Sequence, residues 1–158
     1  MAIAHICLGS NLGDKRAMIA AALTALREAP GVRVLRRSAD YSTPPWGNFD
    51  QDFFVNACAA LETELPPIGL LRACAAVETQ LGRRRQQKWG PRLIDIDLLD
   101  YDGVVVDTPE LVLPHPLMLQ RAFVLTPLAE IAPELRIGTT SVKEALARCD
   151  ARGIWRLD

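Results

Sequence analysis

The chain has 158 residues, of which 49% are hydrophobic and 23% are charged, and its formal net charge is −1. A chain of this length predicts one domain, spanning residues 1–158, with a hydrophobic core of its own. The near-zero net charge excludes a global field that would draw the protein to nucleic acid or to a membrane, so any basic site has to be local.

The N-terminus and the cysteines restrict the cellular setting. The first residues contain no basic leader, and no segment approaches the roughly 18 consecutive apolar residues of a membrane span. We therefore expect a cytoplasmic protein with no membrane partner. The four cysteines (Cys7, Cys58, Cys74 and Cys149) form no CxxC pair, which argues against a zinc site. They lie in apolar segments and are expected to be buried, reduced thiols.

The first third of the chain reads as strand, helix and strand. Residues 2–8 form a short apolar run typical of a buried strand, which ends at the turn-rich segment 9–14. Asp14 can cap the helix that follows, where Ile19, Ala22, Leu23 and Leu26 recur at the spacing of one apolar face. Pro30 and Gly31 end this helix, and a strand is expected from Val32 as far as Tyr41.

The middle of the chain contains two long loops. Residues 42–52 form the first, and an alternating strand follows over 53–63, with Phe53 in its apolar set and Phe54 and Asn56 on its more open face. Pro66 and Pro67 favour a helix start, and Gly82 is a natural helix stop. The second loop, 83–92, leads into a strand that contains Asp95 and Asp97.

The last part of the chain is less regular. A hairpin through Asp102 and Gly103 is expected to extend the Asp95 strand as far as Val106. From Leu111 onward the pattern indicates short helical pieces and turns, with one helix near 141–148. The order strand, helix, strand, strand, helix, strand predicts an α+β protein of the ferredoxin-like βαββαβ type with extra C-terminal elements. Its helices would cover one face of an antiparallel sheet and leave the opposite face open for a site.

Asp95 and Asp97 are the most informative pair in the sequence. Residues two apart in a strand point to the same face, roughly 6–7 Å from each other, while Ile94, Ile96 and Leu98 would point into the core. Two neighbouring carboxylates repel unless a cation lies between them, and Mg²⁺ prefers one or two carboxylates, waters and substrate phosphates. The pair therefore predicts a magnesium site, and two solvated aspartates on an open sheet face are the alternative.

The loop before this strand is strongly basic. Arginine guanidinium groups match phosphate oxygens bidentately, so the loop can hold a triphosphate; the alternative is a solvated loop that only keeps the protein soluble. Its candidate residues are Arg83, Arg85, Lys88 and Arg92.

Aromatic side chains near both loops can stack on a flat heterocycle. The candidates are Trp46, Phe54, Trp89 and Phe123, and the amide of Asn56 can both donate to and accept from the edge of such a ring. For each aromatic residue taken alone, ordinary core packing is the alternative. His115 and Arg121 lie in one further segment that can contact phosphate, although a lone histidine is as often a structural hydrogen-bonding group.

Several short motifs, taken together, resemble the 6-hydroxymethyl-7,8-dihydropterin pyrophosphokinase family of folate biosynthesis. They occur in the family's order and reach to about Pro133; the most specific is Gly-Pro-Arg-x-x-Asp-x-Asp. The matching segments are 8–13, 41–45, 52–57, Glu78 with 82–85, 89–97, and 114–116 with Arg121 and Phe123.

The resemblance implies that pyrophosphate passes from ATP to the hydroxymethyl group of the pterin, with AMP as the other product and two Mg²⁺ ions as cofactors. It implies Asp95 and Asp97 as metal ligands and, with Arg83 and Arg92, as catalytic residues. The implied pterin contacts are Thr43, Pro44, Trp46, Phe54, Asn56, Trp89, Asp95 and Phe123. The implied ATP contacts are Glu78, Arg83, Arg85, Lys88, Trp89, Arg92, His115 and Arg121. The partners are then these two small molecules, without nucleic acid, and we expect a monomer.

Three positions depart from the family pattern. Ala75 stands where a polar residue often contacts the nucleotide, Lys88 replaces the usual arginine, and Trp46 is bulkier than many residues at its place. The competing function is a ferredoxin-like module that binds single-stranded RNA. Against it, Asp95 and Asp97 would repel a phosphate backbone without metal, and the aromatic pattern of such modules is absent.

Overall fold

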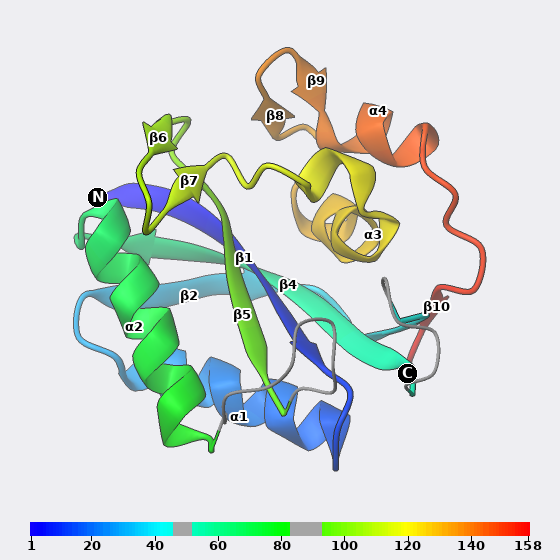
Figure 1. Cartoon of the computed structure of the whole chain (residues 1–158), viewed down its shortest axis with the longest axis horizontal. Coiled ribbons are helices and arrows are strands. Elements are labelled where there is room, and N and C mark those ends of the chain that lie inside the picture. The colour runs from blue at the N-terminus through cyan, green and yellow to red at the C-terminus, as the bar shows by residue number, and fades with distance from the viewer. Residues whose placement is uncertain (46–51, 83–92) are drawn as a thin grey trace.

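The computed structural model describes residues 1–45, 52–82 and 93–158. The strands of its main sheet are β1 (Ala2–Ser10), β2 (Val32–Arg37), β3 (Tyr41–Thr43), β4 (Phe54–Thr63), β5 (Asp95–Tyr101) and β10 (Trp155–Arg156). In this antiparallel sheet β1 lies between β4 and β5, whereas β2 and β3 share the other edge of β4 and β10 extends β3 (Figure 1).

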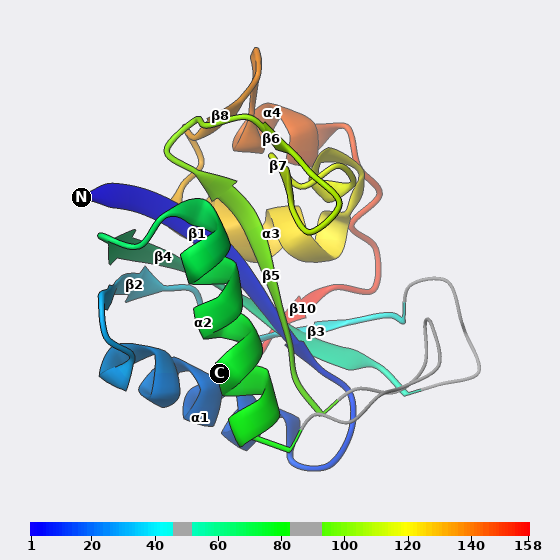
Figure 2. The same ribbon diagram turned by 60° about the vertical axis from the view of Figure 1, so that its left-hand side comes forward.

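Two helices, α1 (Lys15–Glu28) and α2 (Pro67–Gln80), cover one face of the sheet (Figure 2). The Asp14 side chain caps α1 by accepting a hydrogen bond from the Ala17 backbone N–H at 3.1 Å, as the sequence predicted. The predicted apolar stripe of α1 is buried, and it packs against inward-facing residues of β1, β4 and β5. The strand order and the two helices make up the ferredoxin-like βαββαβ arrangement, which confirms the expected fold class.

The opposite face of the sheet is partly covered, which corrects the expectation of an open face. Helix α3 (Ala122–Ile131) packs on β4, and Cys7, Cys58 and Leu99 form a second core with its apolar residues. Short helical pieces were expected from Leu111 onward, and α3 is one continuous helix of ten residues. Pro127 lies inside it and apolar residues cover most of its circumference, so no amphipathic period marked its full extent. Of the described residues, those of α3 cover the middle of this face and leave its end near Asp95 less covered.

Smaller elements add to both cores. The strands β6 (Val106–Asp107) and β7 (Val112–Leu113) contribute apolar side chains to the first core. The 3₁₀ turn η1 (Met118–Gln120), β8 (Arg136–Ile137), which pairs with β9 (Thr140–Ser141), and α4 (Val142–Ala147) contribute to the second. Helix α4 is the helix expected near 141–148, and a capping box between Ser141 and Glu144 begins it.

Three strand predictions need correction. The expected strand from Val32 to Tyr41 is two strands, β2 and β3. Phe53 is 43% exposed and precedes β4 rather than facing the core. The turn at Asp102 and Gly103 forms, with φ of 51° and 73°, but β6 pairs with β7 and not with β5.

The four cysteines all lie within the described ranges and are free thiols, as expected. Cys7, Cys58 and Cys74 are buried, whereas Cys149 is only half-buried. Among the residues that the structure describes, no helix has both the length and the apolar character needed to span a membrane.

Candidate active site

Asp95 and Asp97 begin β5 and lie on the sheet face away from α1 and α2. Ile96 and Leu98 alternate with them and are buried in the core, at 5% and 3% exposure, so the predicted division of faces is confirmed. Both carboxylates are half-buried. Within the described ranges no cluster of three or more His, Cys, Asp or Glu side chains could hold a metal. Two carboxylates suit a hard cation that takes its other ligands from water and substrate phosphates.

Glu78 of α2 fixes the outer edge of β5. Its Oε2 accepts a hydrogen bond from the backbone N–H of Ile96 at 2.7 Å. Ile96 lies between the two aspartates on a strand at the edge of the sheet, so this bond satisfies an edge donor and ties β5 to α2. Glu78, a predicted ATP contact, therefore lies against the backbone between the two aspartates.

Two cysteines, Cys7 and Cys58, lie beside Asp97 in the sheet. Cys7 lies opposite Asp97 in the β1–β5 register and opposite Cys58 in the β1–β4 register. Burial, together with the neighbouring Cys7 thiol, raises the pKa of Cys58 well above its ordinary value, and the charge of Asp97 adds to this effect. Mg²⁺ takes oxygen ligands, so the carboxylates are the donors at this end of the sheet that suit it.

Asn56 is held in one orientation at the centre of the same face. Its Nδ2 donates to Thr43 Oγ1 at 2.7 Å, and the Cys7 thiol lies 3.9 Å from its Oδ1 as a weak donor. Asn56 and Thr43 are 4% and 1% exposed, so Asn56 is more buried than the expected open face implied. Phe54, which pairs with Thr43 in the register, is half-buried.

Gly9 leaves a bare stretch of backbone between Asn56 and Asp95. It is the register partner of both residues, on β4 and β5 respectively. A Cβ atom at this position would lie 2.6 Å from Asn56 Oδ1. The absence of a side chain at Gly9 therefore leaves room for the Asn56 amide, whose Oδ1 lies over this stretch of backbone.

Helix α3 brings Phe123 and Arg121 to the site. Arg121 precedes the helix, is 8% exposed, and places its guanidinium carbon 5.5 Å from the centre of the Phe123 ring. Near the other end of α3, Glu130 Oε1 accepts hydrogen bonds from the Tyr41 hydroxyl at 2.7 Å and the Ala39 N–H at 3.1 Å. These bonds tie α3 to β3 and so fix Phe123 relative to Thr43.

His115 is held by its backbone and by its ring. Its N–H donates to the Leu99 carbonyl at 2.8 Å, and its Nδ1 accepts from the Leu117 N–H at 3.2 Å. Burial, and to a smaller degree the charge of Arg121, lowers the pKa of His115. A neutral ring with Nδ1 as acceptor directs the Nε2 N–H away from that bond, where it can donate to a phosphate or a base.

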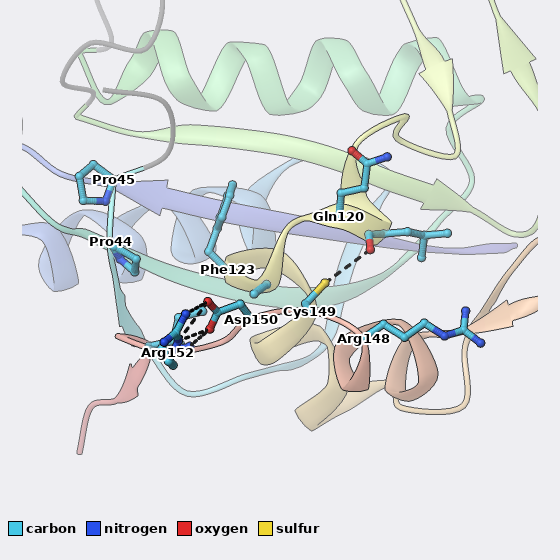
Figure 3. Close-up of a pocket in the computed structure, with 11 residues that line it drawn as sticks. Pro44, Pro45, Gln120, Phe123, Arg148, Cys149, Asp150 and Arg152 are labelled. Carbon is cyan, nitrogen blue, oxygen red and sulfur yellow. Dashed lines mark hydrogen bonds and ion pairs between the residues drawn. The ribbon is translucent and has the colours of Figure 1, made fainter. Parts of the chain in front are cut away.

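A cavity of about 600 Å³ adjoins Phe123 (Figure 3). At its edge Asp150 is paired with Arg152. The predicted pterin contacts Pro44 and Phe123 therefore border a space that the C-terminal segment helps to enclose, which no sequence motif indicated. The lining residues are Pro44, Pro45, Leu119, Gln120, Ala122, Phe123, Arg148, Cys149, Asp150, Arg152 and Ile154.

Six predicted site residues lie outside the described ranges. They are Trp46, Arg83, Arg85, Lys88, Trp89 and Arg92. Conversely, sequence reasoning missed the roles of Gly9, Cys7 and Glu130 in shaping the site. A glycine directly after an apolar strand was the one signal that could have indicated the first of these.

Comparison with known proteins identifies the family. A family model described as 7,8-dihydro-6-hydroxymethylpterin-pyrophosphokinase (HPPK) matches residues 5–133. A 2-amino-4-hydroxy-6-hydroxymethyldihydropteridine pyrophosphokinase of Methylorubrum extorquens is 56% identical over 158 residues, which is 100% of both chains. The protein of the same name from Pseudomonas aeruginosa is 45% identical over 154 residues, covering 97% of this chain and 95% of its own.

Solved structures agree at the level of the fold. The Plasmodium falciparum HPPK-DHPS wild type with pteroate superimposes with a TM-score of 0.75 at 14% identity. That match covers 93% of this chain but only 42% of the other, so the chain spans less than half the length of that protein. With the family model and the two bacterial relatives, the conclusion is that this chain belongs to the 7,8-dihydro-6-hydroxymethylpterin-pyrophosphokinase family.

Proposed function

We propose that the chain transfers pyrophosphate from magnesium-bound ATP to the hydroxymethyl group of 6-hydroxymethyl-7,8-dihydropterin, and that Asp95 and Asp97 hold the metal. The family is one of pyrophosphokinases of folate biosynthesis, and ATP is the donor that such a reaction needs. The site assignment rests on the strand register. Asn56 of β4, Gly9 of β1 and Asp95 of β5 are paired side by side, and Asp97 follows two residues later on the same face of β5.

The carboxylate pair is the proposed seat of two Mg²⁺ ions. Asp95 and Asp97 share a face and are half-buried, so their negative charges repel each other. Cations bound between them would remove this repulsion. Bound magnesium would neutralise phosphate charge and orient the polyphosphate. Glu78, through its bond to the Ile96 N–H, holds the part of β5 that carries both carboxylates to α2.

The pterin is proposed to lie beside Asn56, between the rings of Phe54 and Phe123. Because the Asn56 Nδ2 already donates to Thr43, its Oδ1 is the group presented over Gly9, and an acceptor there suits the N–H groups on the pterin edge. Pro44 and Thr43 would border the ring on the β3 side, as would Trp46, for which the proposal rests on the sequence.

ATP is proposed to lie toward α2 and the segment before α3. Glu78, His115 and Arg121 are the described residues of this group, and Arg121 carries a positive charge in a largely buried position that suits phosphate. The remaining ATP contacts are proposed from the sequence alone. They are Arg83, Arg85, Lys88, Trp89 and Arg92, of which Arg83 and Arg92 are also proposed as catalytic.

In the proposed step the pterin hydroxyl oxygen attacks the β-phosphorus of ATP. A new P–O bond forms in line with the bond that breaks, AMP leaves, and the hydroxyl proton is released. Chemistry of this kind depends on positioning and on electrostatic stabilisation rather than on a covalent intermediate. Fixed groups such as Asn56 and Phe123 supply the positioning.

The direct test is to incubate the protein with ATP, Mg²⁺ and 6-hydroxymethyl-7,8-dihydropterin and to identify the nucleotide product. We expect AMP and pterin diphosphate; ADP as the product would contradict the proposal. Asp97→Ala should abolish turnover while the circular dichroism spectrum is unchanged, and Asp107→Ala, at an exposed position of β6, is the matched control. Near-normal turnover of Asp97→Ala would overturn the metal assignment.

The RNA-binding alternative has no support from the family or the relatives, and we do not propose it. The further proposals are a monomer that acts in the cytoplasm on small molecules, without nucleic acid. Light scattering coupled to size-exclusion chromatography tests the oligomeric state, since a particle of twice the chain mass of 17.4 kDa would contradict a monomer.

A further inference from the structure

Lys15 joins the start of α1 to the residues just before β4. Its Nζ lies 2.7 Å from Asp52 Oδ2 and 3.5 Å from the centre of the Phe53 ring. The ammonium group therefore contacts a carboxylate and the face of an aromatic ring at once. Asp52 and Phe53 are 37 and 38 positions further along the chain, and Phe54, the proposed pterin platform, follows directly.

Local helix chemistry gives no reason for a lysine at this position. Lys15 is the first residue of α1, where the partial positive charge of the helix N-terminus disfavours a cation. Only 12% of its side chain is exposed, although lysine side chains normally extend into water. The contacts with Asp52 and Phe53 offset both costs, so the role of this lysine is a tertiary contact rather than a part in the helix.

A second set of bonds fixes the same segment. Asn11 Nδ2 donates to the Asp52 backbone carbonyl at 3.4 Å, and the Phe53 N–H donates to Asp52 Oδ1 at 2.8 Å. The ammonium group of Lys15 and, to a smaller degree, the Phe53 N–H lower the pKa of Asp52, so this carboxylate stays ionised at neutral pH. Residue 52 is thus held through both its backbone and its side chain.

We propose that Lys15 is a positioning residue for pterin binding. By clasping Asp52 and Phe53 against α1, it holds the start of β4 so that Phe54 is already oriented as a stacking surface before the pterin arrives. Its ammonium group is committed to these two residues and is not assigned to phosphate or metal. This inference rests on the proposed function, because it assumes that Phe54 stacks on the pterin.

The expected effect follows from the two contacts. An exposed ion pair and a cation–π contact together correspond to about a tenfold change in an equilibrium constant. Without the contacts of Lys15, Phe54 would sample other positions in the ligand-free protein. Part of the pterin binding energy would then be used to order Phe54 again. The Michaelis constant for the pterin should therefore rise about tenfold in Lys15→Met, while kcat at saturating pterin and the Michaelis constant for ATP stay close to wild type.

The experiment compares Lys15→Met, Lys15→Arg and Asp52→Asn with wild type in the AMP-forming assay. Arginine keeps the charge and the ring contact and should restore most of the pterin affinity. In the double variant, Asp52→Asn should raise the Michaelis constant for the pterin little beyond the effect of Lys15→Met, because both substitutions remove the same ion pair. Lys143→Met is the matched control, since Lys143 also lies close to a carboxylate, 2.6 Å from Glu134 Oε1, but on α4.

Amide hydrogen exchange of Phe53 and Phe54 in the ligand-free protein supplies a readout apart from activity. We expect faster exchange in Lys15→Met and wild-type rates in Lys15→Arg. An active Lys15→Met enzyme with an unchanged Michaelis constant for the pterin would overturn the inference alone. A wild-type protein that forms no AMP from the pterin would instead overturn the proposed function.

Discussion

Gly9→Ala crowds Asn56, a proposed pterin contact, at a single atom. The added Cβ would lie 2.6 Å from Asn56 Oδ1 and at an ordinary 3.7 Å from Phe54 Cδ2. The strain therefore falls on Asn56, whose amide cannot turn away without breaking its 2.7 Å bond to Thr43 Oγ1. Gly9 has no positive φ, so alanine can adopt its backbone conformation.

The magnitude follows from these contacts. Overpacking of a well-packed position costs about 1–3 kcal/mol, and the lost Asn56–Thr43 hydrogen bond costs about 1 kcal/mol. Alanine also restricts the unfolded chain more than glycine does, which stabilises the folded state by about 0.4–1 kcal/mol. Gly9→Ala should therefore destabilise the fold by about 1–3 kcal/mol, and displacement of the Asn56 acceptor should weaken pterin binding roughly tenfold or more.

A double-mutant cycle assigns this effect to one contact. We expect Gly9→Ala to raise the Michaelis constant for the pterin and lower the midpoint of thermal unfolding. In an Asn56→Ala background the same substitution should do little, because the clashing oxygen is gone. Equal harm in both backgrounds, or normal pterin affinity in Gly9→Ala, would refute the reasoning.

Three further predictions concern the frame around the site. Burial and the hydrogen bond to Glu130 raise the pKa of Tyr41 to about 12; since this phenol ionises near pH 10 in the unfolded chain, unfolding free energy should fall by about 2 kcal/mol between pH 10 and 12. Denaturant titrations of Tyr41→Phe should show a smaller fall, and an equal fall would contradict the assignment. Asp100→Leu should leave the buried His5 Nδ1, 2.7 Å from Asp100 Oδ1, without its partner and cost about 1–3 kcal/mol of unfolding free energy. Replacing both residues by leucine should cost little, and additive losses in urea unfolding would argue against this coupling. Glu78→Ala should leave the Ile96 N–H without its acceptor and cost about 1–3 kcal/mol, whereas Glu78→Gln retains an acceptor and should be near wild type, so equal stability of the two variants would sink the prediction.

The sequence was informative where one local pattern decides the structure. The apolar stripe of α1 and its Asp14 cap are set by neighbouring residues, and both were predicted correctly. The shared face of Asp95 and Asp97 follows from the two-residue period of a strand, and the structure confirms it. These features require no knowledge of what packs against them.

The sequence was silent where distant segments meet. The close approach of Gly9 and Asn56 depends on the β1–β4 register, and the contact between Lys15 and Asp52 joins a helix to the end of a loop. Helix α3 lacks an amphipathic pattern because it is apolar on most sides and contains Pro127. Tertiary packing therefore decides how much of the second sheet face stays open.

The central claim is that Asp95 and Asp97 together hold the metal that carries the triphosphate. A crystal structure of the protein with magnesium and a non-hydrolysable ATP mimic tests it most directly. The account predicts metal density in contact with both carboxylates and with phosphate oxygens of the mimic. Carboxylates turned away from each other, with no ion beside either of them, would contradict it.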